Sequence, residues 1–231
     1  MAKESDLIQK TKRYFQQQAD LGLSEVYLSK KLEVKSTSKE NENWQKSKTL
    51  NELYLKIKDC TKCRLAKNRT KFVFGVGNPK AKVMFIGEGP GREEDLQGEP
   101  FVGRAGQLLD KILVAINFKR EEVYIANMVK CRPPENRDPL PDEMETCHPY
   151  LLKQIEMIKP QIICALGRIA GQYLLNTKEP LNKLRGKIHD YKGIKFLVTY
   201  HPAALLRYPQ YKKETWEGMK LLRKEYEKLN S

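Results

Sequence analysis

Four of the five cysteines in this chain have a spacing that suits a metal or iron–sulfur site. Cys60 and Cys63 form a Cys-x-x-Cys pair, and Cys131 and Cys147 follow far downstream with a wide interval between them. Four thiolates are the usual donors both of tetrahedral zinc and of iron–sulfur clusters. A site that joins Cys60 to Cys147 requires the intervening chain to be one folded unit.

Disulfides, zinc and an iron–sulfur cluster compete for these thiols. The segment MAKESDLIQKTKRYF lacks the apolar run of a secretory signal, and no stretch approaches a membrane span, so we expect a cytoplasmic protein with reduced cysteines. Structural zinc ribbons usually offer two close pairs, but spacing alone leaves zinc and a cluster both open. The fifth cysteine, Cys164 in QIICALG, is expected to be a buried core residue.

The charge of the chain favours nucleic acid as a partner. Lys and Arg number 43 against 29 Asp and Glu, for a net charge of +14. Residues before Cys60 include 12 basic and 9 acidic side chains, and the rest of the chain includes 31 and 20. The excess therefore belongs to the cysteine-bearing part. A solvated lysine-rich surface is the alternative interpretation.

Composition divides the chain near residue 48. Residues 1–34 have a weak helical pattern, and residues 34–48, VKSTSKENENWQKSK, read as a polar linker. A helical pattern at 49–59 then leads into Cys60. We therefore predict an N-terminal extension over residues 1–48, helical or disordered, and a main domain over 49–231.

The main domain alternates between strand-like and helical segments, which predicts an α/β fold with a parallel sheet covered by helices on both faces. Predicted strands are 81–88, 122–129, 160–167 and 193–201. Predicted helices are 104–116, 140–158, 167–175 and 213–229. Ligands of such sheets bind at the carboxyl ends of the strands, which directs attention to four loops.

The first loop, GEGPG at 87–91, lacks the spacings of nucleotide-binding motifs. Its glycines suggest backbone amides close to a ligand. Glu88 could position a water molecule, although an ordinary exposed loop glutamate is the alternative.

The second loop, after strand 122–129, contains Asn127 with Lys130, Arg132 and Arg137. A side-chain amide has a donor and an acceptor side by side and matches the O4 and N3–H edge of a uracil-type base, although asparagine also caps and turns. The third loop begins a helix at Arg168, where the backbone amides could bind an anion or form an ordinary helix start.

The fourth loop, YHPAALLRYP at 200–209, combines His201 with a leucine pair and Arg207. Enzymes that act on a base take it out of the helix, and an inserted apolar side chain offsets the unstacking. This position favours His201 over the other two histidines as the functional one.

These residues together carry a resemblance to a known family. GEGPG with the downstream EPFVGRAGQLLD, then NMVKCRPPENR, then HPAALLR, and the four cysteines, resemble the family 4 uracil-DNA glycosylases, the thermostable iron–sulfur type. The resemblance covers about residues 50 to 229. It implies a three-layer αβα sandwich with a four-stranded parallel central sheet, and a [4Fe–4S] cluster on Cys60, Cys63, Cys131 and Cys147.

The resemblance also implies roles for the loop residues. Phe101 would stack on a flipped uracil, worth roughly 1–3 kcal/mol per base, and Asn127 would read its O4 and N3–H. His201 would hydrogen-bond O2 as charge develops on the leaving base, helped by backbone amides of Glu88 and Gly89. Side chains implied to contact DNA are Leu205, which would fill the gap in the duplex, and Lys130, Arg132, Arg137 and Arg207, which would contact phosphates.

The implied reaction is hydrolysis of the N-glycosidic bond of deoxyuridine, which leaves an abasic site without a lysine nucleophile or lyase step. The chain departs from the wider superfamily's GQDPY motif, because Gly89 stands at the aspartate's position and Glu88 becomes the expected substitute for activating water. The cluster would be structural, with redox sensing on DNA as the alternative.

Two rival functions remain open at this point. One is a covalent uracil binder, whose relatives carry a basic KRRIH-type insertion that ENRDPLPDE lacks. The other is a non-catalytic nucleic-acid-binding or electron-transfer iron–sulfur protein. The expected partner is uracil-containing DNA, single- or double-stranded, bound by a monomer without membrane contact, and a replication clamp or other repair proteins remain open.

Overall fold

The computed structural model describes residues 41–229, so the helical pattern predicted for 1–34 and most of the predicted linker lie outside the described residues. The chain divides into one unit that ends at Asn41 and a compact unit from Glu42 onward. The compact unit thus begins before the predicted boundary at 49, and Trp44 is already buried in it. No helix within 41–229 is long and apolar enough to cross a membrane.

The sheet of the compact unit has six strands in the order β1-β3-β2-β4-β6-β5. The strands are β1 (Val76–Gly77), β2 (Val83–Gly87), β3 (Tyr124–Asn127), β4 (Ile162–Leu166), β5 (Ile188–Tyr191) and β6 (Ile194–Thr199). The inner four run parallel, at the four predicted positions, whereas β1 and β5 pair antiparallel at the two edges. The sheet is therefore mixed and six-stranded, and the expectation of four strands omitted its edges.

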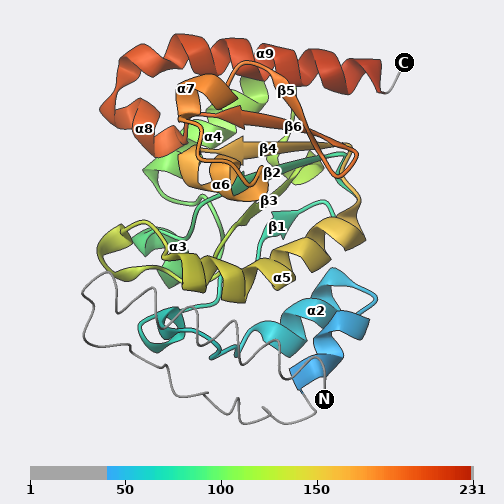
Figure 1. Ribbon diagram of the computed structural model, residues 1–231, viewed down its shortest axis with the longest axis vertical. Helices are drawn as coiled ribbons and strands as arrows, with labels where there is room; N and C mark the ends of the chain where they lie inside the picture. Colours follow the sequence, from blue (N-terminus) through green and yellow to red (C-terminus); the bar gives the residue numbers. More distant parts are fainter. Residues whose placement is uncertain (1–40, 230–231) are drawn as a thin grey trace, which may run out of the picture. The chain divides into compact units, whose positions relative to one another are not determined.

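Helices cover both faces of this sheet (Figure 1). They are α2 (Leu50–Ile57), α3 (Arg92–Gln97), α4 (Arg104–Ala115), α5 (Pro141–Ile158), α6 (Arg168–Leu174), α7 (Leu181–Leu184), α8 (Pro202–Arg207) and α9 (Lys212–Lys228). Short 3-10 helices are η1 (Asn41–Lys46), η2 (Arg64–Lys67), η3 (Arg120–Glu122), η4 (Pro134–Asn136) and η5 (Pro209–Tyr211).

Side-chain alternation along the strands builds the two main cores. In β2, Met84 and Ile86 pack with α5, α6 and α7, while Val83 and Phe85 pack on the opposite face with α4 and α9. Because successive strand residues point to opposite faces, strands buried on both sides are apolar throughout. Cys164 lies in β4 and is fully buried, as predicted.

A third core is built from helices and loops outside the sheet and includes two of the four spaced cysteines. It contains Trp44 and Leu53 of the N-terminal helices, together with Cys131, Cys147 and Tyr150. Helix α2 begins where predicted because the Thr49 hydroxyl accepts a hydrogen bond from the Glu52 N–H, a standard N-cap. The loops at 58–74 then run from α2 to the sheet.

Candidate active site

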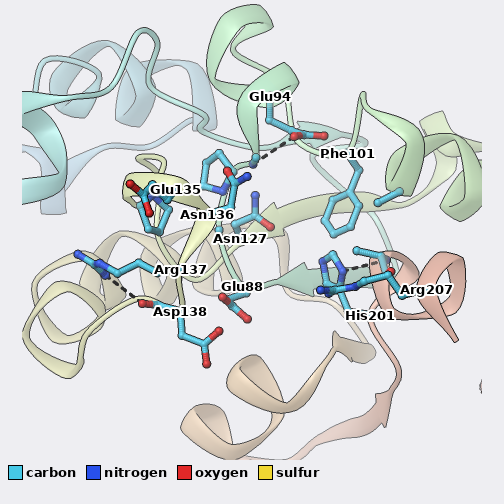
Figure 2. A pocket seen from close by; sticks show the side chains of 16 residues that line it. Glu88, Glu94, Phe101, Asn127, Glu135, Asn136, Arg137, Asp138, His201 and Arg207 are labelled. Carbon is cyan, nitrogen blue, oxygen red and sulfur yellow. Dashed lines mark hydrogen bonds between the residues drawn. The ribbon is translucent and has the colours of Figure 1, made fainter.

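A cavity of about 630 Å³ lies at the carboxyl ends of β2, β3 and β6, where the sequence placed the functional loops. Figure 2 shows Glu88, Phe101, Asn127 and His201 converging on it from separate segments of the chain. Gly89, Arg137 and Arg207 also line the cavity. The structure thus brings together residues from the first, second and fourth predicted loops. The third loop contributes no lining residue, and Arg168 instead forms an ion pair with Asp138 at 2.9 Å.

Asn127 presents an unused hydrogen-bonding group to this cavity. It ends β3 opposite Gly87 of β2 and is only 1% exposed. Its Oδ1 atom is buried and has no hydrogen-bond partner among the described residues. A buried polar atom without a partner is costly, so its presence in a cavity indicates a site for a ligand that donates a hydrogen bond.

The ring of Phe101 forms a second wall of the cavity and lies close to Asn127 across Gly87. A Cβ atom added to Gly87 would stand 2.4 Å from Asn127 Oδ1 and 2.7 Å from Phe101 Cζ. Only glycine at position 87 therefore leaves room for the side chains of both Asn127 and Phe101 at the end of β2. The Phe101 ring also lies 5.4 Å from the His201 ring, centroid to centroid, at an angle of 34°.

The backbone of Phe101 is strained. Its φ is +56°, in the left-handed region that non-glycine residues rarely adopt. Gly106 in α4 lies so close that an added Cβ would be 1.9 Å from the Phe101 carbonyl oxygen. Strain of this kind costs of order 1–3 kcal/mol and tends to be retained at functional sites.

Glu94, which the sequence analysis does not single out, links the start of α3 to the segment that follows Phe101. Its Oε1 accepts hydrogen bonds from the N–H groups of Val102 and Gly103, both at 3.0 Å, and its Oε2 accepts one from Gly91 at 3.1 Å. A Glu at the third position of a helix that begins after Gly91 is the acidic half of a capping box, which is a readable sequence signal.

His201 is held in one orientation and one tautomer. It caps α8, and its Nδ1 accepts a hydrogen bond from the Ala203 N–H at 3.2 Å. Burial lowers the pKa of His201 to about 4, so the ring is neutral at physiological pH. With Nδ1 accepting, the single ring proton is on Nε2.

Glu88 follows β2 directly and faces the cavity. Burial, and to a lesser extent the negative charge of Asp138, raises the pKa of Glu88 to about 7, while Arg168 opposes this shift. Gly89 next to it approaches Val129 so closely that an added Cβ would stand 2.8 Å from Val129 Cγ2. A carboxyl with a pKa near neutrality can take up and release a proton under working conditions.

The prediction that Lys130 contacts phosphate is wrong. Lys130 is fully buried, and its Nζ donates to the Asn127 carbonyl oxygen at 2.9 Å and to Gln154 Oε1 at 2.6 Å. Burial lowers the pKa of Lys130 to about 8. A basic residue in a loop was read as exposed, whereas tertiary packing turns this side chain into the interior.

Leu205 is likewise not at the surface. It is 1% exposed and lies on the buried face of α8, whereas its neighbour Leu206 is 40% exposed. Leu206 is therefore the member of this leucine pair that is accessible in the structure, and the burial of Leu205 does not support its predicted insertion into DNA. The exposed Arg207 lines the cavity and donates from Nε to the Ala203 carbonyl oxygen at 3.4 Å.

The two remaining predicted cations differ in their surroundings. Arg137 makes a two-point ion pair with the fully buried carboxylate of Glu143, at 2.8 and 2.6 Å. Arg132 donates from Nε to Asn136 Oδ1 at 2.8 Å and is partly exposed. Arg137 therefore braces the loop, while Arg132 stays near the surface.

The four spaced cysteines gather around the third core. Cys131 and Cys147 belong to that core, and Cys60 and Cys63 pack against it. Arg69 Nη1 donates to Cys131 Sγ and Tyr150 Oη to Cys60 Sγ, both at 3.3 Å. Within residues 41–229, no three His, Cys, Asp or Glu side chains are close enough to hold a single metal ion.

Burial and the neighbouring cysteines both disfavour the charged, thiolate form of these side chains. Burial raises the pKa of Cys63 and Cys131, and it raises the pKa of Cys147 to about 12. Smaller rises in each case come from the neighbouring cysteines, Cys60 among them. Four thiolates at this place would need a positive centre between them to be stable.

The amino-acid sequence was also compared with those of known proteins. Residues 74–220 match the model of the Uracil DNA glycosylase superfamily. A Type-4 uracil-DNA glycosylase of Archaeoglobus fulgidus is 47% identical over 174 residues, which cover 72% of this chain and 87% of that protein. Another from Saccharolobus solfataricus is 51% identical over 166 residues, covering 68% and 77%.

A third, from Thermotoga maritima, is 49% identical over 154 residues, covering 66% of this chain and 80% of that protein. The superfamily match at 74–220 contains the cavity loops together with Cys131 and Cys147. The chain belongs to the uracil-DNA glycosylase superfamily, and within it to the type-4 uracil-DNA glycosylases.

Proposed function

We propose that this protein is a monofunctional uracil-DNA glycosylase, which hydrolyses the N-glycosidic bond of deoxyuridine in DNA and leaves an abasic site for base excision repair. The observation that carries this proposal is the unpartnered Oδ1 of Asn127 in a cavity walled by Phe101 and His201. Family membership supplies the substrate class, and the cavity supplies the groups that such a reaction requires.

Recognition of the base rests on Asn127 and Phe101. Oδ1 of Asn127 would accept the N3–H of uracil, and its amide NH₂ would donate to O4. Cytosine has an acceptor at N3 and an amino group in place of O4, so it would leave both groups of Asn127 mismatched. Stacking on Phe101 adds roughly 1–3 kcal/mol and does not distinguish between bases.

Departure of the base rests on His201. The neutral ring would donate its Nε2–H to O2 of uracil, where negative charge grows as the glycosidic bond breaks. Backbone amides at Glu88 and Gly89 would assist at the same oxygen. The ionised carboxylate of Glu88 would orient or deprotonate the water that adds to C1′ of the sugar.

The cysteines fit a [4Fe–4S] cluster held by Cys60, Cys63, Cys131 and Cys147. The fit rests on the donor set, because four thiols from three segments surround one core and their charged forms need a cationic partner. When bound, the cluster would offset part of the negative charge of the thiolates and crosslink the loop after α2, the loop after β3, and α5. Hydrolysis transfers no electron, so this proposal gives the cluster a structural role.

Contacts with DNA would come from the rim of the cavity. Arg207 and Arg132 are the candidates for phosphate contacts, and the exposed Leu206 would fill the space left by the flipped nucleotide. Arg137 would hold the loop through Glu143. We also propose that the protein is cytoplasmic and acts as a monomer on single- or double-stranded DNA.

The direct test incubates the full-length protein with an oligonucleotide that contains one uracil, followed by alkali. Cleavage at uracil, with none at cytosine or thymine, supports the proposal. His201→Ala should abolish cleavage while DNA binding survives. A protein–DNA adduct that persists under denaturing conditions would instead indicate a covalent uracil binder. Unchanged activity of His201→Ala would indicate that the cavity is not the catalytic site.

A further inference from the structure

We propose that Lys130 is a positioning residue for uracil excision, which acts through the main chain of Asn127 and makes no contact with DNA. The inference rests on the proposed function, because it assigns Lys130 to the base-reading side chain. Its side chain runs back from the loop after β3 into the interior and ends beneath the cavity.

The peptide group that joins Asn127 to Met128 is fixed at both of its polar ends. Its carbonyl oxygen accepts from Lys130 Nζ at 2.9 Å, and its N–H donates to the Gly87 carbonyl oxygen at 2.9 Å. Asn127 is the last residue of β3, and the next residues stay tied to the segment after β2 through their N–H groups, since Val129 N–H also donates to the Glu88 carbonyl oxygen at 3.1 Å. The lysine fixes the other end of this peptide plane, its carbonyl oxygen.

Gln154 of α5 fixes the ammonium group in turn. Its Oε1 accepts from Lys130 Nζ at 2.6 Å, while its Nε2 donates to the Phe74 carbonyl oxygen at 3.0 Å and to Tyr124 Oη at 3.2 Å. Lys130 and Gln154 are both 0% exposed. The network thus ties Asn127 to α5, to the backbone of the segment before β1, and through Tyr124 to the start of β3.

This arrangement explains a charged side chain where packing alone would favour an apolar one. A buried ammonium is costly, and here it donates to neutral oxygens, one of which belongs to the base-reading residue. Asn127 must also fit within a narrow space over Gly87, where a shift of its backbone would carry the amide into Phe101 or away from the base. Reading groups on such a site need support that sets them to within about 0.5 Å.

The test is Lys130→Met in the full-length protein, which keeps the length of the side chain and removes the donor. We expect the single-turnover rate of uracil excision to fall on the order of 10²-fold, as for a misplacement of about 1 Å. DNA affinity and its salt dependence should not change. A phosphate contact would instead weaken binding and lower the salt slope by about 1.

A double-mutant cycle separates positioning from general support. If Lys130 acts through Asn127, then adding Lys130→Met to Asn127→Ala should cause no further loss of excision rate. The same fold-loss in both backgrounds would overturn the proposal. So would a wild-type excision rate for Lys130→Met, provided that the wild-type protein excises uracil. Absence of excision by the wild-type protein would overturn the proposed function itself.

Lys195→Met is the matched control, because it removes a lysine from an ion pair with Glu225 at 2.5 Å, away from the cavity. Its excision rate should equal that of the wild type even where its melting temperature falls. If Lys130→Met does not fold, Gln154→Met gives the second measurement, since it removes one acceptor of the ammonium. A smaller loss of rate that vanishes in the Asn127→Ala background would support the proposal, and a loss that persists there would contradict it.

Discussion

Two titratable side chains that face the cavity have pKa values displaced in opposite senses. The pKa of Glu88 is raised to about 7 and that of His201 is lowered to about 4. Burial is the main cause of both shifts, since it disfavours a carboxylate in the first case and an imidazolium in the second. Near neutrality the histidine is therefore a neutral donor, while the glutamate changes its charge.

This difference predicts how excision depends on pH. The rate under single-turnover conditions should rise as the pH increases through about 7, because Glu88 becomes the carboxylate that acts on water. His201 titrates far below this range and should not contribute. Glu88→Gln should remove the rise and lower the rate by roughly 10²–10⁴-fold, typical of a lost general base.

The same shift has a consequence for stability. The pKa of Glu88 is higher in the folded than in the unfolded protein, so ionisation penalises the folded state. This contribution should lower the free energy of unfolding as the pH rises from about 4.5 to about 7 and should level off above that, and Glu88→Gln should lack it. A pH–rate profile of Glu88→Gln identical to that of the wild type would show that another group activates the water.

At the residue scale, the positions after predicted strands point to Glu88, Asn127 and His201, and the family resemblance adds Phe101; the structure places all four around one cavity. The sequence motifs could not distinguish a surface lysine from a buried one. Lys130 lies in a loop that also contains Arg132 and Arg137, and only the packing of α5 against the sheet shows that its side chain is internal.

At the element scale, the approach of α4 to the segment around Phe101 determines the shape of the cavity. Gly106 permits this approach, since its absent side chain leaves room for the Phe101 carbonyl. Gly106→Ala should destabilise the protein by about 1–3 kcal/mol, typical of overpacking, and should also slow excision because the Phe101 ring must move. Chemical denaturation and single-turnover kinetics measure the two effects.

Gly218→Ala in α9 is the matched control for this prediction. The nearest atom to its added Cβ would be Thr199 Oγ1 at 3.8 Å, an ordinary contact. Alanine in a helix interior is better than glycine by about 1 kcal/mol, so this variant should be as stable as the wild type or more so, with full activity. Equal stability of Gly106→Ala and Gly218→Ala would contradict the close packing described here.

The strands and helices themselves were largely predictable. The apolar runs of the sequence coincide with β2, β3, β4 and β6, because a strand that is buried on both faces consists mostly of consecutive apolar residues. The edge strands were missed for a physical reason. β1 has two residues, and β5 is only partly buried, so neither carries a pattern distinct from a loop.

At the scale of the whole molecule, the four spaced cysteines come from parts of the chain that lie outside the sheet. Cys60 follows α2, Cys131 lies in the loop after β3, and Cys147 is in α5. A cluster at this place would fix the loop that carries both Asn127 and Lys130. The spacing of the cysteines predicts four ligands but leaves zinc and iron–sulfur open, because both accept the same donors, and only the family resemblance favours the cluster.

Replacement of Cys131 by Ala tests the structural role of the cluster. The purified variant should lose its brown colour and a substantial part of its thermal stability together, since apo thiols lose the crosslink. Cys164→Ala is the matched control, because Cys164 is buried in β4 and belongs to the sheet core. It should keep the colour and lose only on the order of 1 kcal/mol. Full stability of a colourless Cys131→Ala would contradict the structural role.

A comparison of the wild type with Asn127→Ala tests whether Asn127 reads uracil in this cavity. Single-turnover release of free uracil and binding to the same oligonucleotide would be measured for both proteins. The wild type should release uracil but not cytosine, and Asn127→Ala should bind DNA normally while its excision falls severely. Release of uracil by Asn127→Ala at the wild-type rate, or no release by the wild type at any temperature, would contradict this role of Asn127.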